Sequence, residues 1–359
     1  MEWDAAPYDV IAQPRHGMAP PLQLTRENLV AHQTLDILDL KLLQALELDG
    51  RAPFSHIAHV LGVSDQTVAR RFRRLRGTAR LRVTGMIDDS RLGRTSWIVR
   101  LGCAHDTAAQ LAAVLAGRPD THYVDLAAGG TEVVCAIKPH SRQDRDELLL
   151  ERLQRTPHVT SVSAHCILRA YYGNSLRWLR KISALDPEEE SALRAPASVP
   201  PAAPVVLDAA EQTMLQVLRR DGRAPLTELQ AATGLSETVV KRRLERLRAT
   251  GVLYLAVEYD HEPLGQGVEA LCWLTVAPHA LARAGQEVAR HREVRFAAAV
   301  TGRTNLVVSA LCRTTDDLYG FLTEKIGALG DVHTAETVLT LRRVKTLTTE
   351  LAPAASGTG

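Results

Sequence analysis

The sequence predicts an α+β protein made of two copies of one unit, in which three helices precede a β-α-β-β-α-β segment. The pentapeptide Asp-Gly-Arg-Ala-Pro occurs at residues 49–53 and again at residues 221–225. Residues 35–82 align with residues 207–254 without a gap, and about 20 of these positions are identical. A chain of 359 residues also has room for several domains. We therefore expect the interpretation of one copy to apply to the other.

Composition shifts divide the chain into seven segments. Two segments rich in proline and without hydrophobic periodicity are expected to be a flexible leader and a semi-stiff linker. The segments are the leader (1–33), a first helical domain (34–90), a first sheet domain (91–182), the linker (183–206), a second helical domain (207–262), a second sheet domain (263–351) and a flexible tail (352–359).

Each helical domain has the pattern of a helix-turn-helix. Leucines at helical spacing from Leu35 to Leu46 predict a first helix, which should end at Gly50 in a left-handed conformation. Pro53 opens a second helix, and Ser64 follows the turn as the N-cap of a third. The apolar stripe of the third helix must face the other two helices; it consists of Val68, Phe72 and Leu75 in the first copy and of Val240, Leu244 and Leu247 in the second.

Each sheet domain shows alternating strands and helices in the order β-α-β-β-α-β. The expected elements of the first are strand 97–101, helix 107–116, strands 122–127 and 133–137, helix 142–155 and strand 159–168. Those of the second are strand 268–276, helix 280–291, strands 294–300 and 306–311, helix 315–329 and strand 332–341. Two helices on one face leave the other face of such a sheet bare, which predicts association with another sheet.

The outward face of the third helix is typical of a DNA-reading helix. Arginines suit phosphate contacts and guanine, glutamine can pair with adenine, and the free amides at the helix N-terminus favour a phosphate. The residues assigned to DNA are Ser64, Gln66, Thr67, Arg70, Arg71, Arg73 and Arg74, with Ser236, Thr238, Lys241, Arg242 and Arg246 in the second copy. A solvated charged helix is the simpler alternative, but the helix-turn-helix context favours DNA.

The two reading helices are expected to differ. Glu245 replaces Arg73, and Glu237 adds a second acidic side chain to the later copy. Carboxylates repel phosphates, so we expect the first copy to dominate the salt-dependent affinity and the operator to be asymmetric.

Composition excludes several other classes of protein. The 43 Lys and Arg nearly balance the 41 Asp and Glu, so the chain has no global polybasic character. Five widely spaced cysteines without a Cys-x-x-Cys pair indicate a reducing, cytoplasmic setting. No signal sequence, long apolar run, metal-ligand spacing or catalytic triad is evident, so we expect no membrane span, metal, cofactor or catalytic residues.

These motifs, taken in order, resemble the Lrp/AsnC family of transcription regulators. The matching positions include Leu35-Asp36, Asp49-Gly50-Arg51, Leu61-Gly62-Val63-Ser64 and Leu92-Gly93, together with Leu207-Asp208, Gly234-Leu235-Ser236, Gly251-Val252-Leu253 and Leu264-Gly265. The resemblance implies winged helix-turn-helix domains that alternate with ferredoxin-like sensing domains. It also implies that sensing domains pair sheet to sheet and bind small effectors such as amino acids. Ala79-Arg80-Leu81 departs from the pattern, because a glycine is usual there.

The resemblance also suggests where an effector would bind. In the family a glycine and an acidic residue occupy the turn between the second and third strands. The residues at this position are Gly129 and Glu132 in the first copy and Gly302, Thr304 and Asn305 in the second. Glycine would let backbone amides approach a carboxylate, although a plain hairpin turn explains the same residues.

Two other functions remain open at this stage. Siroheme decarboxylases share this architecture, but the histidines here are scattered and form no pair typical of a haem or metal site. An architectural DNA-binding protein that senses no ligand is the second alternative, because a sensing domain that has lost its ligand keeps its apolar core. We expect a cytoplasmic, nucleoid-associated protein whose two sensing domains pair within the chain, with a homo-oligomer as the alternative.

Overall fold

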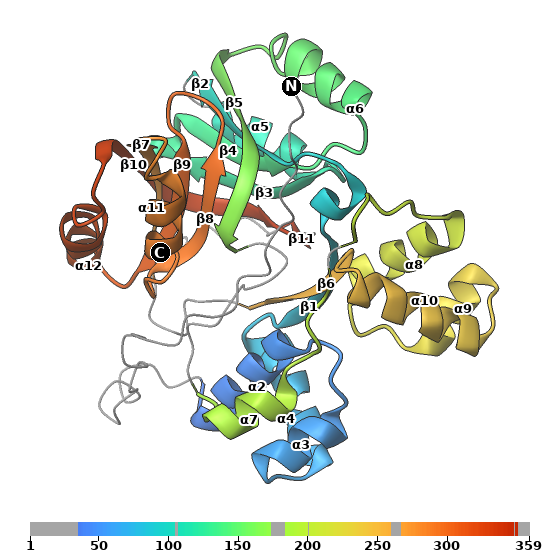
Figure 1. Ribbon diagram of the computed structural model, residues 1–359. Helices are drawn as coiled ribbons and strands as arrows, with labels where there is room; N and C mark the ends of the chain where they lie inside the picture. The colour runs from blue at the N-terminus through green and yellow to red at the C-terminus, as the bar shows by residue number, and fades with distance from the viewer. Residues whose placement is uncertain are drawn as a thin grey trace, which may run out of the picture.

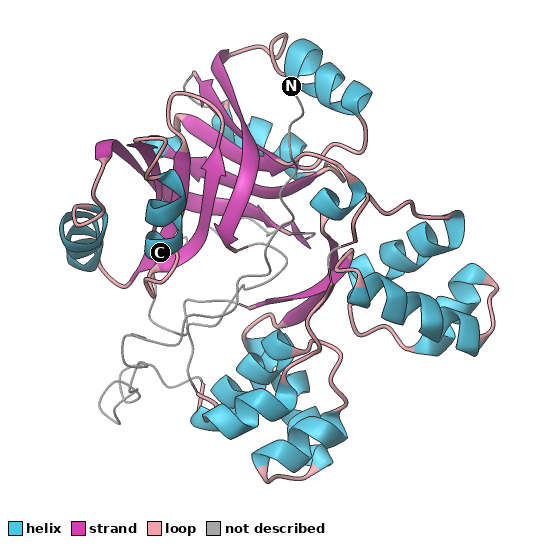
Figure 2. Cartoon of the chain, in the orientation of Figure 1, coloured by secondary structure: helices cyan, strands magenta, loops and turns pink. Residues whose placement is uncertain are grey.

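The computed structural model describes residues 35–104, 107–173, 184–199, 201–259, 267–347 and the backbone of 349–350. The expected leader and tail lie outside the described residues. Two helical domains, here called the first and second heads, stand apart from a body of strands and are joined to it near a short two-stranded ribbon (Figure 1). Figure 2 shows that the strands gather in this body and that helices flank it.

Both heads contain the predicted three helices. The first head consists of α2 (Ile37–Leu48), α3 (Phe54–Leu61) and α4 (Asp65–Thr78), and the second of α8 (Ala209–Arg220), α9 (Leu226–Thr233) and α10 (Glu237–Ala249). Asp36 and Asp208 begin α2 and α8 with reciprocal side-chain caps. Gly62 ends α3 with a φ of 66°, the left-handed conformation that allows the sharp turn into α4.

The strand that follows each reading helix pairs with its counterpart in the other copy. Strands β1 (Arg82–Ile87) and β6 (Leu253–Glu258) form an antiparallel ribbon in which Thr84 lies opposite Ala256. Ala256 is the position that corresponds to Thr84 in the aligned repeat. The ribbon therefore relates the two heads by an approximate two-fold axis.

The repeated pentapeptides contact each other across this axis. Arg51 donates from Nη1 to the carbonyl of Gly222 at 2.7 Å and from Nη2 to that of Ala224 at 2.9 Å. Arg223 donates in the same way to the carbonyls of Gly50 at 2.6 Å and Ala52 at 3.0 Å. We call these two arginines and their four carbonyl partners the arginine clasp. It joins the heads through the motif that reveals the duplication.

Gly50 does not adopt the left-handed conformation expected from the sequence. It is absent from the glycines with positive φ, and α2 ends at Asp49 in an extended conformation. A side chain at Gly50 would lie 2.9 Å from Leu255 and Val83 of the ribbon. Gly222 is equally close to the backbone of β1 and donates its amide to the carbonyl of Val83 at 2.7 Å. Close approach of the ribbon, rather than backbone handedness, thus requires glycine at both positions.

The sheet domains follow the predicted order of elements. The first contains β2 (Trp97–Cys103), α5 (Ala108–Ala116), β3 (Thr121–Ala127), β4 (Glu132–Ile137), α6 (Arg142–Asp146), its π-helical continuation η3 (Glu147–Arg152), and β5 (Val159–Tyr172). The second contains β7 (Val268–Val276), α11 (Leu281–Val288), β8 (Val294–Val300), β9 (Leu306–Cys312), α12 (Thr315–Gly320), η5 (Phe321–Ile326) and β10 (Val332–Thr346). The short elements η1 (Asp89–Leu92), η2 (Ala128–Gly130) and β11 (Thr349–Glu350) complete the described chain.

The two sheets close on each other within the chain. β5 pairs with β8, and β10 pairs with both β3 and β7, so the strands form a continuous ring. The apolar side chains enclosed between the sheets include Ile98, Val134, Leu271, Trp273 and Val307. The bare faces inferred from the sequence are therefore buried against each other.

The closing strands are longer than predicted. β5 continues to Tyr172 and β10 to Thr346, beyond the expected ends at 168 and 341. The additional residues pair with the other copy, as where Tyr172 lies opposite Ala297 and Thr346 opposite Tyr123. Local periodicity did not reveal these extensions because their partners are distant in sequence.

The expected linker contains a helix that packs on the first head. Helix α7 (Pro187–Leu193) begins at Asp186 with a reciprocal cap from Glu189. Leu185 and Leu193 are buried in the core of the first head, and the ammonium of Lys41 lies 2.6 Å from Glu189. A helix of 7 residues is too short to display a hydrophobic period, which is why the sequence suggested a plain linker.

Replacing either clasp arginine by alanine leaves two carbonyls of buried residues without donors, so we expect each variant to lose about 1–3 kcal/mol of stability. Arg223→Ala should lose a further ~0.5–1 kcal/mol because a cation–π contact is also lost; its guanidinium lies 4.5 Å from the ring centroid of Phe54. The corresponding residue in the second head is Leu226. Thermal unfolding followed by circular dichroism measures both losses. Arg220→Ala, a change at an exposed residue, is the control. A clasp variant with the melting temperature of the wild type would contradict a stabilising role for the clasp.

Candidate nucleic-acid interface

Helix α4 presents a polar face to solvent, as its pattern predicts. The Ser64 hydroxyl accepts the amide of Thr67 at 3.2 Å, which confirms the N-cap. Val68 and Leu75 are buried, and Phe72 packs against Phe54 with ring centroids 5.1 Å apart. The exposed residues along the opposite side of this helix are Gln66, Arg70, Arg73, Arg74 and Arg76.

Two of the arginines assigned to DNA make ion pairs inside the first head. Arg71 lies 3.0 Å from Asp39 and also contacts Asp36, while Arg74 contacts the other oxygen of Asp39. The side chain of Asp39 is fully buried, so its charge depends on these two guanidinium groups. Arg71 and Arg74 therefore fasten α4 to α2.

The second head repeats this arrangement. Arg246 lies 2.5 Å from Glu211, whose side chain is 1% exposed, and Arg243 contacts Asp208. Sequence reasoning overlooked Asp39 and Glu211. The available signal was an acidic residue at the same position of the first helix in both copies, three residues after the capping Asp.

The cations that remain available for DNA differ between the heads. Among the described residues, Arg70 has no ion pair, and Arg73 donates to the carbonyl of Ala69 in its own helix. In α10, Lys241 and Arg242 are exposed beside Glu245, whereas the equally exposed Arg246 is already paired with Glu211. Ser236 occupies the N-cap of α10 without a side-chain hydrogen bond, and Thr238 is exposed.

The polar groups of both expected effector turns are engaged in the fold. Glu132 accepts from Arg100 at 2.5 and 3.2 Å, and Arg100 also binds Glu336 of the other sheet at 2.7 Å. Asn305 accepts the amide of Val276 at 2.8 Å and donates to its carbonyl at 2.7 Å.

The two turns also differ in accessibility. A side chain at Gly302 would lie 2.5 Å from the ring of His165, which belongs to the other sheet domain, and Thr304 is half-buried. Nothing lies within 4 Å of a side chain built at Gly129 or Gly130. Both turns are exposed, but His165 of the other sheet domain lies directly beside Gly302, whereas the space beside Gly129 and Gly130 is empty.

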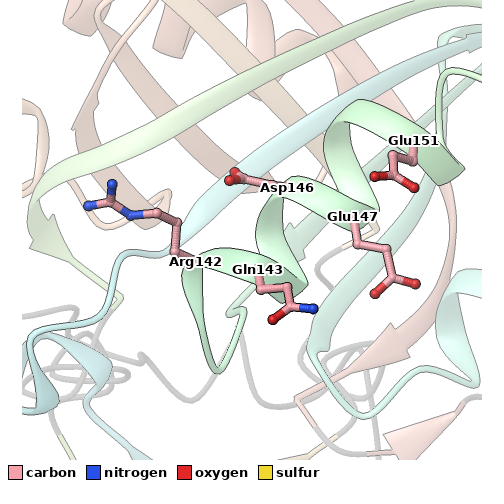
Figure 3. Close-up of a pocket in the computed structure, with 5 residues that line it drawn as sticks. All are labelled: Arg142, Gln143, Asp146, Glu147 and Glu151. Carbon is pink, nitrogen blue, oxygen red and sulfur yellow. The ribbon is translucent and has the colours of Figure 1, made fainter.

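A surface hollow of about 610 Å³ lies on the outer side of α6 and η3. Its lining consists of Arg142, Gln143, Asp146, Glu147 and Glu151. Figure 3 shows these side chains spread along one helix and pointing in different directions. Asp146 and Glu147 are already paired with Arg145 and Arg152, so the hollow lacks the convergent polar groups of a binding site.

Metal-binding and membrane-spanning features are absent from the described part of the chain. No group of three or more His, Cys, Asp or Glu side chains within it is arranged to hold a metal ion. None of its helices has the length and apolar character needed to cross a bilayer. Its five cysteines are free, and Cys103, Cys135, Cys272 and Cys312 are buried.

Comparison with known families identifies three regions of the chain. Residues 35–76 match the AsnC-type helix-turn-helix domain, residues 207–254 a winged helix-turn-helix DNA-binding domain, and residues 269–349 the Lrp/AsnC ligand binding domain. The HTH-type transcriptional regulator FL11 of Pyrococcus abyssi is 30% identical over 149 residues, which cover 41% of this chain and 97% of that regulator. The chain belongs to the Lrp/AsnC family. The leucine-responsive regulatory protein of Rhizobium meliloti is likewise 30% identical over 146 residues, 39% of this chain and 93% of that protein.

Among solved structures, the siroheme decarboxylase NirDL resembles most of this Lrp/AsnC chain. The match has a TM-score of 0.60, covers 88% of this chain and 94% of NirDL, and has 16% sequence identity. At that identity the similarity establishes a shared fold alone.

Replacing Arg71 by alanine should destabilise the first head, because it removes a partner from the buried carboxylate of Asp39. We expect a loss of about 1–3 kcal/mol. Arg70→Ala, one residue earlier on the exposed face, should change stability by less than about 0.5 kcal/mol. Thermal unfolding distinguishes the two, and equal melting temperatures would show that the ion pairs to α2 contribute nothing.

Proposed function

We propose that this chain is a DNA-binding transcriptional regulator in which both heads contact one double-stranded site. The observation that carries the proposal is the pairing of two helix-turn-helix heads through the ribbon and the arginine clasp. Each head presents an N-capped reading helix with exposed cations, and the approximate two-fold axis suits adjacent half-sites on a duplex. The names of the similar regulators support the same function.

The proposed operator consists of two unlike half-sites. Arg70 and Arg73 give the first reading helix two exposed guanidinium groups, each able to bind guanine or phosphate. In the second helix Glu245 stands where the first has Arg73, and it repels phosphate. Because the clasp fixes both heads together, each operator should contain one strong and one weak half-site.

Selection of bound sequences from a random duplex pool tests this proposal. We expect recovered sites with two different half-sites at a constant spacing. In a titration against a recovered site, replacing both Arg70 and Arg73 by alanine should reduce the slope of log affinity against log salt by about 2. Replacing both Lys241 and Arg242 is the matched control and should weaken binding far less. No enrichment would refute the function, whereas a perfect palindrome or equal losses would refute the asymmetry.

We further propose that a small effector such as an amino acid binds at the open turn of the first sheet domain. Backbone amides near Gly129 and Gly130 are accessible there, and the adjacent Glu132 offers a carboxylate if Arg100 is displaced. The turn at Gly302 is the less suitable of the two, because His165 lies against it. The Lrp/AsnC ligand binding domain matched by residues 269–349 has the same order of elements as the first sheet domain, which supports a ligand site in this kind of domain.

Titration calorimetry with a panel of amino acids tests the effector site. A ligand that binds the wild type should bind Glu132→Ala about tenfold more weakly, since a charge-assisted contact is lost. Asn305→Ala, the corresponding change in the second turn, should retain the wild-type affinity, with circular dichroism to verify folding. Unchanged binding in Glu132→Ala would exclude this site.

An enzymatic role analogous to that of NirDL is the second candidate, and the shared whole-chain fold is the observation in its favour. Several histidine side chains make contacts within the protein. His165, for example, hydrogen-bonds through Nδ1 to the carbonyl of Thr301 at 2.7 Å and stacks on Trp273. A Soret-type absorbance in the purified protein would favour the enzyme, and its absence the regulator.

A further inference from the structure

A small cavity lies where the second head, the ribbon and the first sheet domain meet. Its volume is about 40 Å³. Side chains from all three parts line it: Arg219 comes from α8, Asp89 and Arg94 follow β1, and His122, Lys138 and His140 belong to the first sheet domain. A ligand here would therefore contact a reading head and a sensing domain at once.

The lining carries an excess of basic groups. Asp89 is its acidic member and lies 3.5 Å from the Lys138 ammonium and 3.7 Å from Arg94. Lys138 also donates to the carbonyl of Ile87 at 3.2 Å, and Arg219 donates to that of Pro119 at 2.6 Å. Within the lining, one carboxylate thus faces Lys138, Arg94 and Arg219, while Asp88 and Asp120 lie outside the lining near Lys138 and Arg219.

A buried imidazole in this cavity lacks a hydrogen-bond partner. The side chain of His122 is 9% exposed, and its Nδ1 has no partner among the described residues. Burial lowers the pKa of His122 well below its usual value, and the nearby charges of Lys138, Arg219 and Lys345 lower it further. A buried polar atom without a partner is costly, and an anion would supply both an acceptor and compensating charge.

The corresponding junction in the other half of the molecule lacks two of these cations, although Arg295 occupies the position of His122. The aligned repeat places Glu47 where the second head has Arg219. The strand registers of the two sheet domains place Leu311 at the position of Lys138. Because the same fold forms with Glu47 and Leu311, the fold itself does not require Arg219 or Lys138.

The size of the cavity limits what it can hold. About three water molecules fit into 40 Å³, because one requires roughly 10–15 Å³ by this measure. A single phosphate or carboxylate group matches that space and the basic lining. We propose that this junction is a binding site for one small oxyanion, either free phosphate or the carboxylate of a small organic acid.

Occupation of the site would join the second head to the first sheet domain through charge-assisted hydrogen bonds. The occupied state would favour the present orientation of that head over any other. This regulatory consequence rests on the proposed function, whereas the binding site itself does not.

Calorimetric titration of the DNA-free full-length protein with inorganic phosphate and, separately, with acetate tests the proposal. Sodium chloride at matched ionic strength is the control for screening. We expect one binding event per chain for at least one oxyanion. Arg219→Gln and Lys138→Leu should each weaken it about tenfold or more, since each removes a charge-assisted hydrogen bond. Lys138→Leu introduces the residue that the second sheet domain has at the equivalent position, Leu311.

Arg313→Ala is the matched control, because Arg313 is the exposed counterpart of His140 in the second sheet domain. This variant should bind the oxyanion with the affinity of the wild type. Preference for phosphate or acetate would identify the ligand class. Failure of both oxyanions to bind, or unchanged affinity in a folded Arg219→Gln protein, would overturn the site. Because no DNA is present, either result is independent of the selection experiment that tests the regulator function.

Discussion

The reciprocal hydrogen bonds of Arg51 and Arg223 are the contacts on which the arrangement of the heads depends. Each planar guanidinium satisfies two carbonyls of the opposite pentapeptide, so four acceptors in buried residues receive donors from only two side chains. The ribbon of β1 and β6 passes beside these contacts, and Gly50 and Gly222 permit its close approach. The orientation of the two reading helices follows from this junction, because both helices belong to heads that it holds together.

Joining two copies in one chain allows them to differ. A dimer of identical chains presents every surface twice, whereas here each of several paired positions has two different occupants. Arg100 of one sheet corresponds to Trp273 of the other, and the two stack with 4.7 Å between the guanidinium and the ring centroid. Arg73 and Glu245 differ on the reading helices, and Lys138 and Leu311 differ at the junctions. Such differences make the proposed operator asymmetric and restrict the proposed oxyanion site to one of the two junctions between head and sheet domain.

Much of the fold could be predicted from local patterns. The stripe of Val68 and Leu75, the cap at Ser64 and the order of strands each depend on residues close together in sequence. The candidate site was harder to predict, because surface arginines in a helix have similar patterns whatever they bind. Arg71 and Arg70 are adjacent and chemically identical, yet only Arg71 faces the buried Asp39, which lies 32 residues earlier. Helix α7 was overlooked for a related reason, since its stability comes from contacts with α2 and α3 rather than from its own period.

The sequence by itself determined the duplication, the element order, the caps and the bare sheet faces, because these depend on composition and short-range spacing. Tertiary structure alone decided which strands close the ring of sheets and which arginines remain available for DNA. It also decided why the glycines of the repeated pentapeptide must be glycine. Each of these outcomes depends on groups that are far apart in the chain and meet only when the two copies fold against each other. Residues that pair across such distances leave no periodic pattern in the sequence. The repeat itself did indicate that each copy has a second copy to pair with.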